Sequence, residues 1–209
     1  MFSFLCPSRN PDFGPEVGIA RTWTLTGYLA IGESVDITFD ASPFGLGALL
    51  EVSGNWAAYI ESRLLPEDAR MLGQSIGSSK GQQTFECLIC LVALRAWKSY
   101  WRGVRVVLRV RGDNFTALTM LLSMNVRGAG PNLIAREVAL ELADGAFAPQ
   151  VVAHLPGVAN DLSDALSRRF DPAKAPWSFP RALRHVPRTA VPSRDAAYYL
   201  SSVAPPLPA

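Results

Sequence analysis

Four acidic residues stand out in this chain of 209 residues by their positions. Asp40 ends the alternating stretch 35–40, a pattern typical of a half-buried strand. Glu86 lies in the first turns of an apolar helical pattern, Asp113 follows a second β-rich run, and Asp164 falls in a short helical pattern near residue 165. Because strand ends and helix faces can converge on one edge of a sheet, these carboxylates are candidate metal ligands.

The chemistry that requires such a cluster is phosphoryl transfer assisted by two metal ions. Two Mg²⁺ ions about 4 Å apart activate a water and stabilise the leaving oxygen of an in-line displacement. Mg²⁺ prefers hard oxygen ligands and keeps several waters, so a few carboxylates suffice. Clustered carboxylates repel one another in the absence of cations. The expected cofactor is therefore Mg²⁺, as two ions, with Mn²⁺ as a substitute.

Each of these acids also has an ordinary structural explanation. Glu86 could complement a helix N-terminus, and Asp113 could belong only to a turn or a helix cap. Asp164 could be a surface residue while the neighbouring Asp161 caps the last helix. A strand-end aspartate such as Asp40 is most often a turn former. It is the occurrence of all four acids in suitable places that favours a metal site.

The charges are distributed unevenly, although the formal net charge is only +2. Residues 33–70 hold seven acids and two bases, whereas residues 95–111 hold six bases and no acid. An acidic region beside a basic one suits a metal site that handles a polyanion, although ordinary solvated charge explains the same pattern. The bases of the second region are Arg95, Lys98, Arg102, Arg105, Arg109 and Arg111.

The hydrophobic patterns predict the elements that must position the acids. Three leading strands joined by tight turns are expected to be antiparallel. Later strands separated by helices add to the sheet by crossover connections. The predicted fold class is therefore α/β, with a five-stranded mixed sheet flanked by helices. The expected strands are 35–40, 46–52, 55–62, 104–110 and 150–155, and the expected helices are 82–100, 115–123, 131–143 and 161–169.

We expect one domain with two appendages. The predicted domain covers residues 34–170, preceded by an irregular arm at 1–33. Residues 172–209 carry eight prolines, so the stretch 171–209 is predicted to be an extended, disordered tail.

Cysteine usage and apolar runs bear on the compartment. Three cysteines, an odd number, argue against a disulfide framework and favour a reducing compartment. Cys87 and Cys90 lack a second pair to complete a zinc site and lie among apolar residues, so buried packing is predicted. Residues 1–6 lack the charged leader of a signal peptide, and the run 87–94 is too short to span a bilayer. We expect a soluble intracellular protein without a membrane partner, in either the cytoplasm or the nucleus.

Four segments, 39–50, 86–94, 112–114 and 154–168, carry a more specific pattern. In this order they resemble the opening strand and turn, the glutamate-bearing helix, the third acidic site and the closing signature of one family, the ribonuclease H domain of retroelement (LTR- or DIRS-like) reverse transcriptases. The closing segment, His-Leu-Pro-Gly followed by an Asn and then Ser-Asp-Ala-Leu-Ser-Arg, is the most specific match. The resemblance covers residues 35–170.

The resemblance implies an RNase H-like fold and an endonuclease that hydrolyses the RNA strand of RNA–DNA hybrids. It implies that the four acids are the metal ligands. His154 matches a loop histidine that helps move protons or release product, the alternative being a strand-end histidine bonded to backbone. Asn160 matches an asparagine of the same loop, which could serve only to shape it. The candidate nucleic-acid contacts are Ser42, Asn114, Arg127, Arg136 and Asn160.

The chain departs from the family pattern at three positions. Phe39 and Gly112 stand where Thr is common, and Ser163 replaces an Ala before Asp164, but none of these changes removes a carboxylate. The aromatic-x-Asp-Asp motif of a polymerase does not occur, so a polymerase partner would be encoded separately or lost. Two alternatives remain open: a non-catalytic hybrid-binding or scaffold domain, and another nuclease of the superfamily, such as an exonuclease or a DNA strand-transfer enzyme.

Overall fold

The computed structural model describes residues 2–4, 21–23, 34–101, 106–145, 151–156 and 160–200. Of the predicted N-terminal arm, it describes two short strands, β1 (Phe2–Phe4) and β2 (Arg21–Trp23), which pair antiparallel. The rest of the arm lies outside the described residues.

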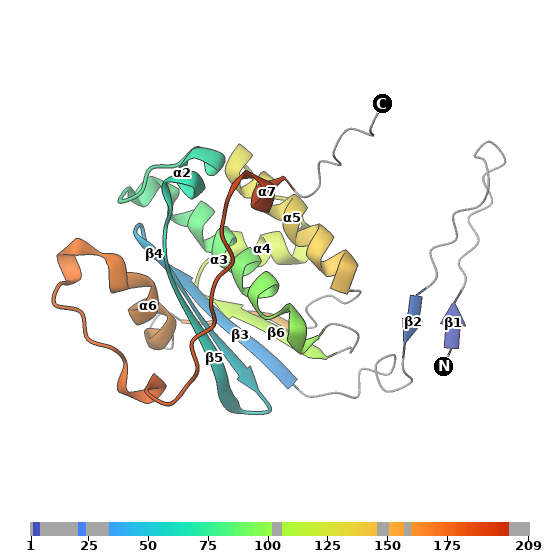
Figure 1. The fold of residues 1–209 in the computed structure, drawn as a ribbon. Helices are drawn as coiled ribbons and strands as arrows, with labels where there is room; N and C mark the ends of the chain where they lie inside the picture. The colour runs from blue at the N-terminus through green and yellow to red at the C-terminus, as the bar shows by residue number, and fades with distance from the viewer. Residues whose placement is uncertain are drawn as a thin grey trace.

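A five-stranded mixed sheet forms the centre of the molecule (Figure 1). Its strand order is β5-β4-β3-β6-β7, in which β3, β4 and β5 are antiparallel and β6 and β7 continue the sheet in parallel with β3. This order and these directions confirm the predicted fold class, the RNase H-like arrangement. The strands are β3 (Ser34–Ala41), β4 (Gly45–Val52), β5 (Asn55–Arg63), β6 (Val107–Gly112) and β7 (Val151–His154).

Helices cover both faces of this sheet (Figure 1). The long α3 packs on β3 with α4 and α5 beside it, whereas α6 lies on the opposite face against β3 and β4. The alternation along β3 explains this division, because Val35, Ile37 and Phe39 enter the core with α3 and leave Asp36 and Asp40 on the other face. The helices are α2 (Pro66–Leu72), α3 (Gln82–Ala96), α4 (Phe115–Ser123), α5 (Ala129–Gly145), α6 (Asp161–Ser167) and α7 (Ala196–Tyr199).

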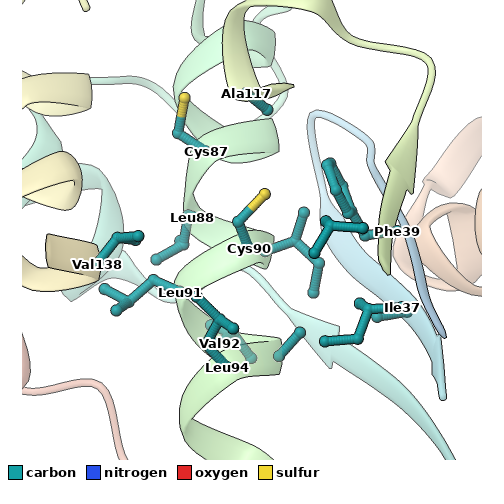
Figure 2. Close-up of a cluster of buried hydrophobic side chains, with 14 of the residues drawn as sticks. Ile37, Phe39, Cys87, Leu88, Cys90, Leu91, Val92, Leu94, Ala117 and Val138 are labelled. Atoms are coloured by element: carbon teal, nitrogen blue, oxygen red, sulfur yellow. The ribbon is translucent and has the colours of Figure 1, made fainter. Parts of the chain in front are cut away.

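The core sits between α3 and the sheet, and Figure 2 shows its centre. Cys87 and Cys90 project from α3 into apolar surroundings among Phe39, Ala117 and the helix's own leucines. Burial raises the pKa of the Cys87 thiol to about 12 and also raises that of Cys90, which leaves both thiols unreactive. The prediction that this pair serves packing is confirmed.

Several boundaries differ from those predicted. The helix expected at 82–100 ends at Ala96 and is followed by a 3₁₀ turn, Lys98–Tyr100. The next strand is displaced toward the C-terminus and ends at Gly112, so Asp113 directly follows it. The helix expected to open at Pro131 begins two residues earlier, at Ala129, and holds the proline in its first turn.

The prediction of a disordered tail is wrong for residues 171–200. The Tyr59 amide donates to the Pro187 carbonyl over 3.0 Å, and the Thr189 amide donates to the Tyr59 carbonyl over 2.8 Å, so this segment pairs along the edge of β5. The Trp97 indole N–H donates to Thr189 Oγ1 over 2.8 Å. Leu183 is fully buried. The proline content did not reveal these long-range contacts.

A buried ion pair fastens the same segment to α2. The Arg194 guanidinium lies 2.8 Å from the Asp68 carboxylate, and both side chains are almost inaccessible. Arg194 also donates to Ser62 Oγ over 2.9 Å, and the Tyr199 hydroxyl donates to Asp68. These internal hydrogen bonds replace the contacts with water that the two charged groups lose when they are buried. Residues 201–209 lie outside the described residues, and the division of the chain into three parts stays a prediction.

Among the described residues, no helix combines the length and the apolar character needed to cross a lipid bilayer.

Candidate active site

Three carboxylates meet at one edge of the sheet. Asp40, Glu86 and Asp113 each offer a ligand oxygen, and these oxygens lie within 4.8 Å of one another. Asp40 is near the end of β3, and Asp113 directly follows β6, its parallel neighbour. The carboxyl ends of parallel strands lie at the same edge, and the second turn of α3 brings Glu86 to it. The convergence expected from the sequence therefore exists for three of the four acids.

The cluster is electrostatically costly without a cation. Burial, with contributions from the charges of Asp164 and Asp113, raises the pKa of Asp40 to about 7, although a hydrogen bond from Ser167 opposes this. Burial and the charges of Asp40 and Asp113 raise the pKa of Glu86 well above its usual range. The metal-free cluster therefore retains protons near neutral pH.

One of the two carboxylate oxygens of Glu86 is buried without a hydrogen-bond partner in the part of the chain that the structure describes. The Gln82 amide donates to Glu86 Oε1 over 3.1 Å and also to the Ala41 carbonyl. Glu86 Oε2 is buried and has no hydrogen-bond partner among the described residues. A buried carboxylate oxygen without a donor is costly, and a divalent cation shared with the two aspartates would satisfy it. The residues present therefore fit Mg²⁺, whose preferred ligands are carboxylate oxygens.

Asp164 lies near the cluster but not in it. Its carboxylate Oδ1 is 2.6 Å from Nε of Arg168, the residue directly after α6, and the Asp164 side chain is 38% exposed. Such i,i+4 pairs are favourable on a helix surface. Its backbone carbonyl accepts a hydrogen bond of 3.0 Å from Ser167 Oγ. Its role as a fourth ligand stays a prediction.

Two buried serines join α6 to the end of β3. The Ser167 hydroxyl lies 2.5 Å from Asp40 Oδ2, and the Ser42 hydroxyl donates to the Ser167 carbonyl over 2.7 Å. Gly47 permits this approach, because a Cβ there would collide with the backbone of α6. Ser42 is buried and its hydroxyl is used in these bonds, which argues against the prediction that it contacts nucleic acid.

Asn160 and Asn114 also use their side chains internally. The buried Asn160 amide donates to the Phe39 carbonyl over 3.1 Å, which supports the alternative that it shapes the loop and removes it from the candidate contacts. Asn114 Oδ1 accepts from the amides of Thr116 and Ala117 at 2.9 and 3.2 Å, capping α4. Asn114 as a whole is half-buried, and its side-chain amide stays a candidate contact.

The two predicted arginines differ in whether they line a pocket. Arg127 is exposed and lines a pocket of about 450 Å³ together with Gln83, Phe115 and Thr116, residues that flank Glu86 and Asp113 in the sequence. Arg136 is exposed on α5 and does not line this pocket. The role of either arginine in binding phosphate stays a prediction.

His154 lies at the end of β7, beside the third acid. Its ring Nε2 is 3.1 Å from the Asp113 carbonyl oxygen. The Phe115 ring stacks on it, with centroids 4.8 Å apart and planes inclined at 18°. The backbone contact that was an alternative explanation for this histidine is present, and it lies within the candidate site.

Phe39 and Gly112, the two positions at which the resemblance leads one to expect Thr, lie against each other. A Cβ at Gly112 would come within 2.7 Å of the Phe39 ring. The large Phe39 in β3 therefore requires the small Gly112 in the neighbouring strand β6. The pair maintains the packing beneath both strand-end aspartates.

Sequence reasoning missed three residues of the site: Gln82, Phe115 and Ser167. Gln82 stands four residues before Glu86, a helical spacing that indicates a side-chain contact. Ser167 stands in the closing signature, three residues after Asp164. Nothing in the sequence signals the contact of Phe115 with His154, since these residues are far apart along the chain.

Of the comparisons with known proteins, only the one with solved structures finds a similar chain. No protein-family model matches the chain, and no curated protein matches it. Among solved structures, the chain is similar to an RNase H1 isolated from compost by a metagenomic approach, with 15% sequence identity and a TM-score of 0.44 over 68% of this chain and 97% of that chain.

Proposed function

We propose that this protein is a Mg²⁺-dependent endonuclease that hydrolyses the RNA strand of RNA–DNA hybrids and derives from a retroelement reverse transcriptase. The observation that carries the proposal is the cluster of Asp40, Glu86 and Asp113, with an unpartnered buried oxygen on Glu86. The resemblance of segment 154–168 to the family's closing signature supports the retroelement origin. A polymerase partner would be encoded separately or lost.

Asp40, Glu86 and Asp113 would hold the metal, with Asp164 as a fourth ligand once its carboxylate leaves Arg168. When bound, two Mg²⁺ ions, or Mn²⁺ in their place, supply an activated water and charge neutralisation at the reacting phosphate.

The protein's own contribution is positioning. Gln82 fixes one oxygen of Glu86, and Ser167 fixes one oxygen of Asp40, so that both carboxylates are held before substrate arrives. His154, exposed at the rim beside Asp113, would exchange a proton with the leaving group or assist product release.

The proposed substrate follows from how nucleic acids differ. A hybrid is distinguished from duplex DNA by the 2′-hydroxyls of one strand, and contacts to sugars and phosphates carry no sequence information directly. Arg127, Arg136 and the Asn114 amide are the proposed contacts. Cleavage is expected to have weak sequence preference.

The test is an assay with labelled RNA–DNA hybrid, duplex DNA and duplex RNA in Mg²⁺. The wild type is expected to cut only the RNA strand of the hybrid. Asp40→Asn, Glu86→Gln and Asp113→Asn are expected to lose at least about 100-fold in rate, since each removes a charged ligand. Asp161→Asn is the matched control, because Asp161 is an exposed acid on α6 outside the cluster. Absence of cutting by the wild type, or equal cutting by Asp40→Asn, would refute the proposal.

A second candidate function is a non-catalytic hybrid-binding domain. The observation that favours it is the pairing of Asp164 with Arg168 outside the cluster. It predicts salt-sensitive hybrid binding without turnover. Metal-dependent cleavage in the same assay would exclude it.

A further inference from the structure

Phe115 is unusual for a large apolar side chain. It is 71% exposed at the first position of α4, so it contributes little to the core and burial does not explain it. Its ring nevertheless has a defined partner, the parallel ring of His154 at 4.8 Å. Stacked aromatic pairs at this separation attract each other beyond the area they bury.

The second contact of His154 determines which ring nitrogen carries a proton. A backbone carbonyl can only accept a hydrogen bond, so Nε2, which lies 3.1 Å from the Asp113 carbonyl oxygen, must be the donor. In the neutral ring, Nδ1 is then the unprotonated nitrogen. It is the ring atom left to accept or deliver a proton.

The backbone that carries this ring is held against the neighbouring strand β6. His154 pairs with Gly112 at the end of β7, and the Leu155 amide donates to the Gly112 carbonyl over 2.8 Å. Phe115 is held in turn by the Asn114 cap of α4. One short segment, 112–115, therefore supplies a metal-ligand candidate and both contacts of the histidine ring.

We propose that Phe115 is a positioning residue that holds the His154 ring on the Asp113 carbonyl, so that Nδ1 is the nitrogen presented to the substrate. The part of this inference that concerns cleavage rests on the proposed function. The docking of the ring itself does not, and it can be measured on the metal-free protein.

The chain has two histidines, so the imidazole NMR signals of His154 can be read against those of His185 as an internal reference. The wild type is expected to show an Nε2–H tautomer for His154 and ring protons shifted by the Phe115 ring current. Phe115→Leu, which keeps apolar bulk, is expected to lose both signatures, and Phe115→Tyr is expected to keep them. Leu122→Ala is the matched control, because Leu122 is 69% exposed on the same helix, seven residues further along it.

The kinetic readout separates positioning from folding. Loss of an aromatic pair is expected to lower kcat on hybrid by roughly two- to twelvefold, with KM within about twofold because substrate contacts remain. Phe115→Tyr is expected to restore kcat. Unchanged His154 signals in Phe115→Leu would show that Phe115 does not hold the His154 ring. A wild-type kcat in that variant would show that the placement of this ring by Phe115 does not matter for cleavage. A wild type that cuts nothing would remove the proposed function and leave the docking to be decided by NMR.

Discussion

Replacing Asp40 by Asn is expected to stabilise the metal-free protein. Asp36 and Asp40 lie on the same face of β3, and both are 5% exposed, yet their partners are opposite in charge. Asp36 is 2.7 Å from Arg111, whereas Asp40 faces the carboxylates of Glu86 and Asp113. The same change of Asp to Asn should therefore have opposite effects at the two positions.

The magnitude follows from the pKa of Asp40, which moves from 3.8 to about 7 on folding. Three pKa units correspond to at most about 4 kcal/mol at about 1.4 kcal/mol per unit. Because the folded state holds the proton more tightly, stability is greatest below pH 4 and falls as the pH rises to about 7, above which the loss is complete. Asn cannot ionise, so the gain from Asp40→Asn should grow over this range and be constant above it.

The assay is urea unfolding in EDTA between pH 4 and pH 8.5 for the wild type, Asp40→Asn and Asp36→Asn. At pH 8, Asp40→Asn is expected to be more stable than the wild type by about 1–4 kcal/mol. Asp36→Asn is expected to be less stable by about 1–3 kcal/mol, because it removes the negative charge that pairs with Arg111. A stability difference between Asp40→Asn and the wild type that does not vary with pH, or a loss in both variants, would show that burial and the neighbouring carboxylates do not raise the pKa of Asp40 as argued.

Three further predictions concern the metal, α6 and the C-terminal segment. Mg²⁺ should raise the unfolding temperature of the wild type but not of Asp40→Asn, because a ligand at 100 times its Kd adds about 2.7 kcal/mol only where its site exists; calorimetry with and without EDTA measures this, and equal shifts would contradict a site at Asp40. Arg168→Gln should tighten Mg²⁺ binding by freeing the Asp164 carboxylate, at a cost of about 0.5 kcal/mol or less in stability; a Mg²⁺ titration by calorimetry is the measurement, and weaker binding would speak against Asp164 as a ligand. Arg194→Ala should destabilise the protein by about 3–5 kcal/mol, because it leaves the Asp68 carboxylate buried without a partner; urea unfolding tests it against Arg184→Ala, an exposed arginine of the same segment, and a similar small effect in both would contradict the packing described for residues 171–200.

Local sequence determined the framework of this protein. Short turns after residues 41 and 52 fixed three antiparallel strands, because a tight reversal permits only that pairing. Helices between the later strands fixed parallel additions, because such a connection must cross over the sheet. Asp40 and Asp113 were predicted at one edge for the same reason, since the carboxyl ends of neighbouring parallel strands lie together.

Only the tertiary structure decided which polar side chains face the cluster and which face the protein interior. Ser42 and Asn160 have polar side chains of the kind that contact nucleic acids. In the folded protein α6 lies close over Gly47, and both side chains form hydrogen bonds to backbone carbonyls of the protein interior instead. Residues 171–200 looked like a disordered tail because proline content is a local property. The Arg194–Asp68 pair that anchors this segment joins residues 126 apart in the chain, and a contact of that kind depends on how packed elements meet in space, which no local pattern encodes.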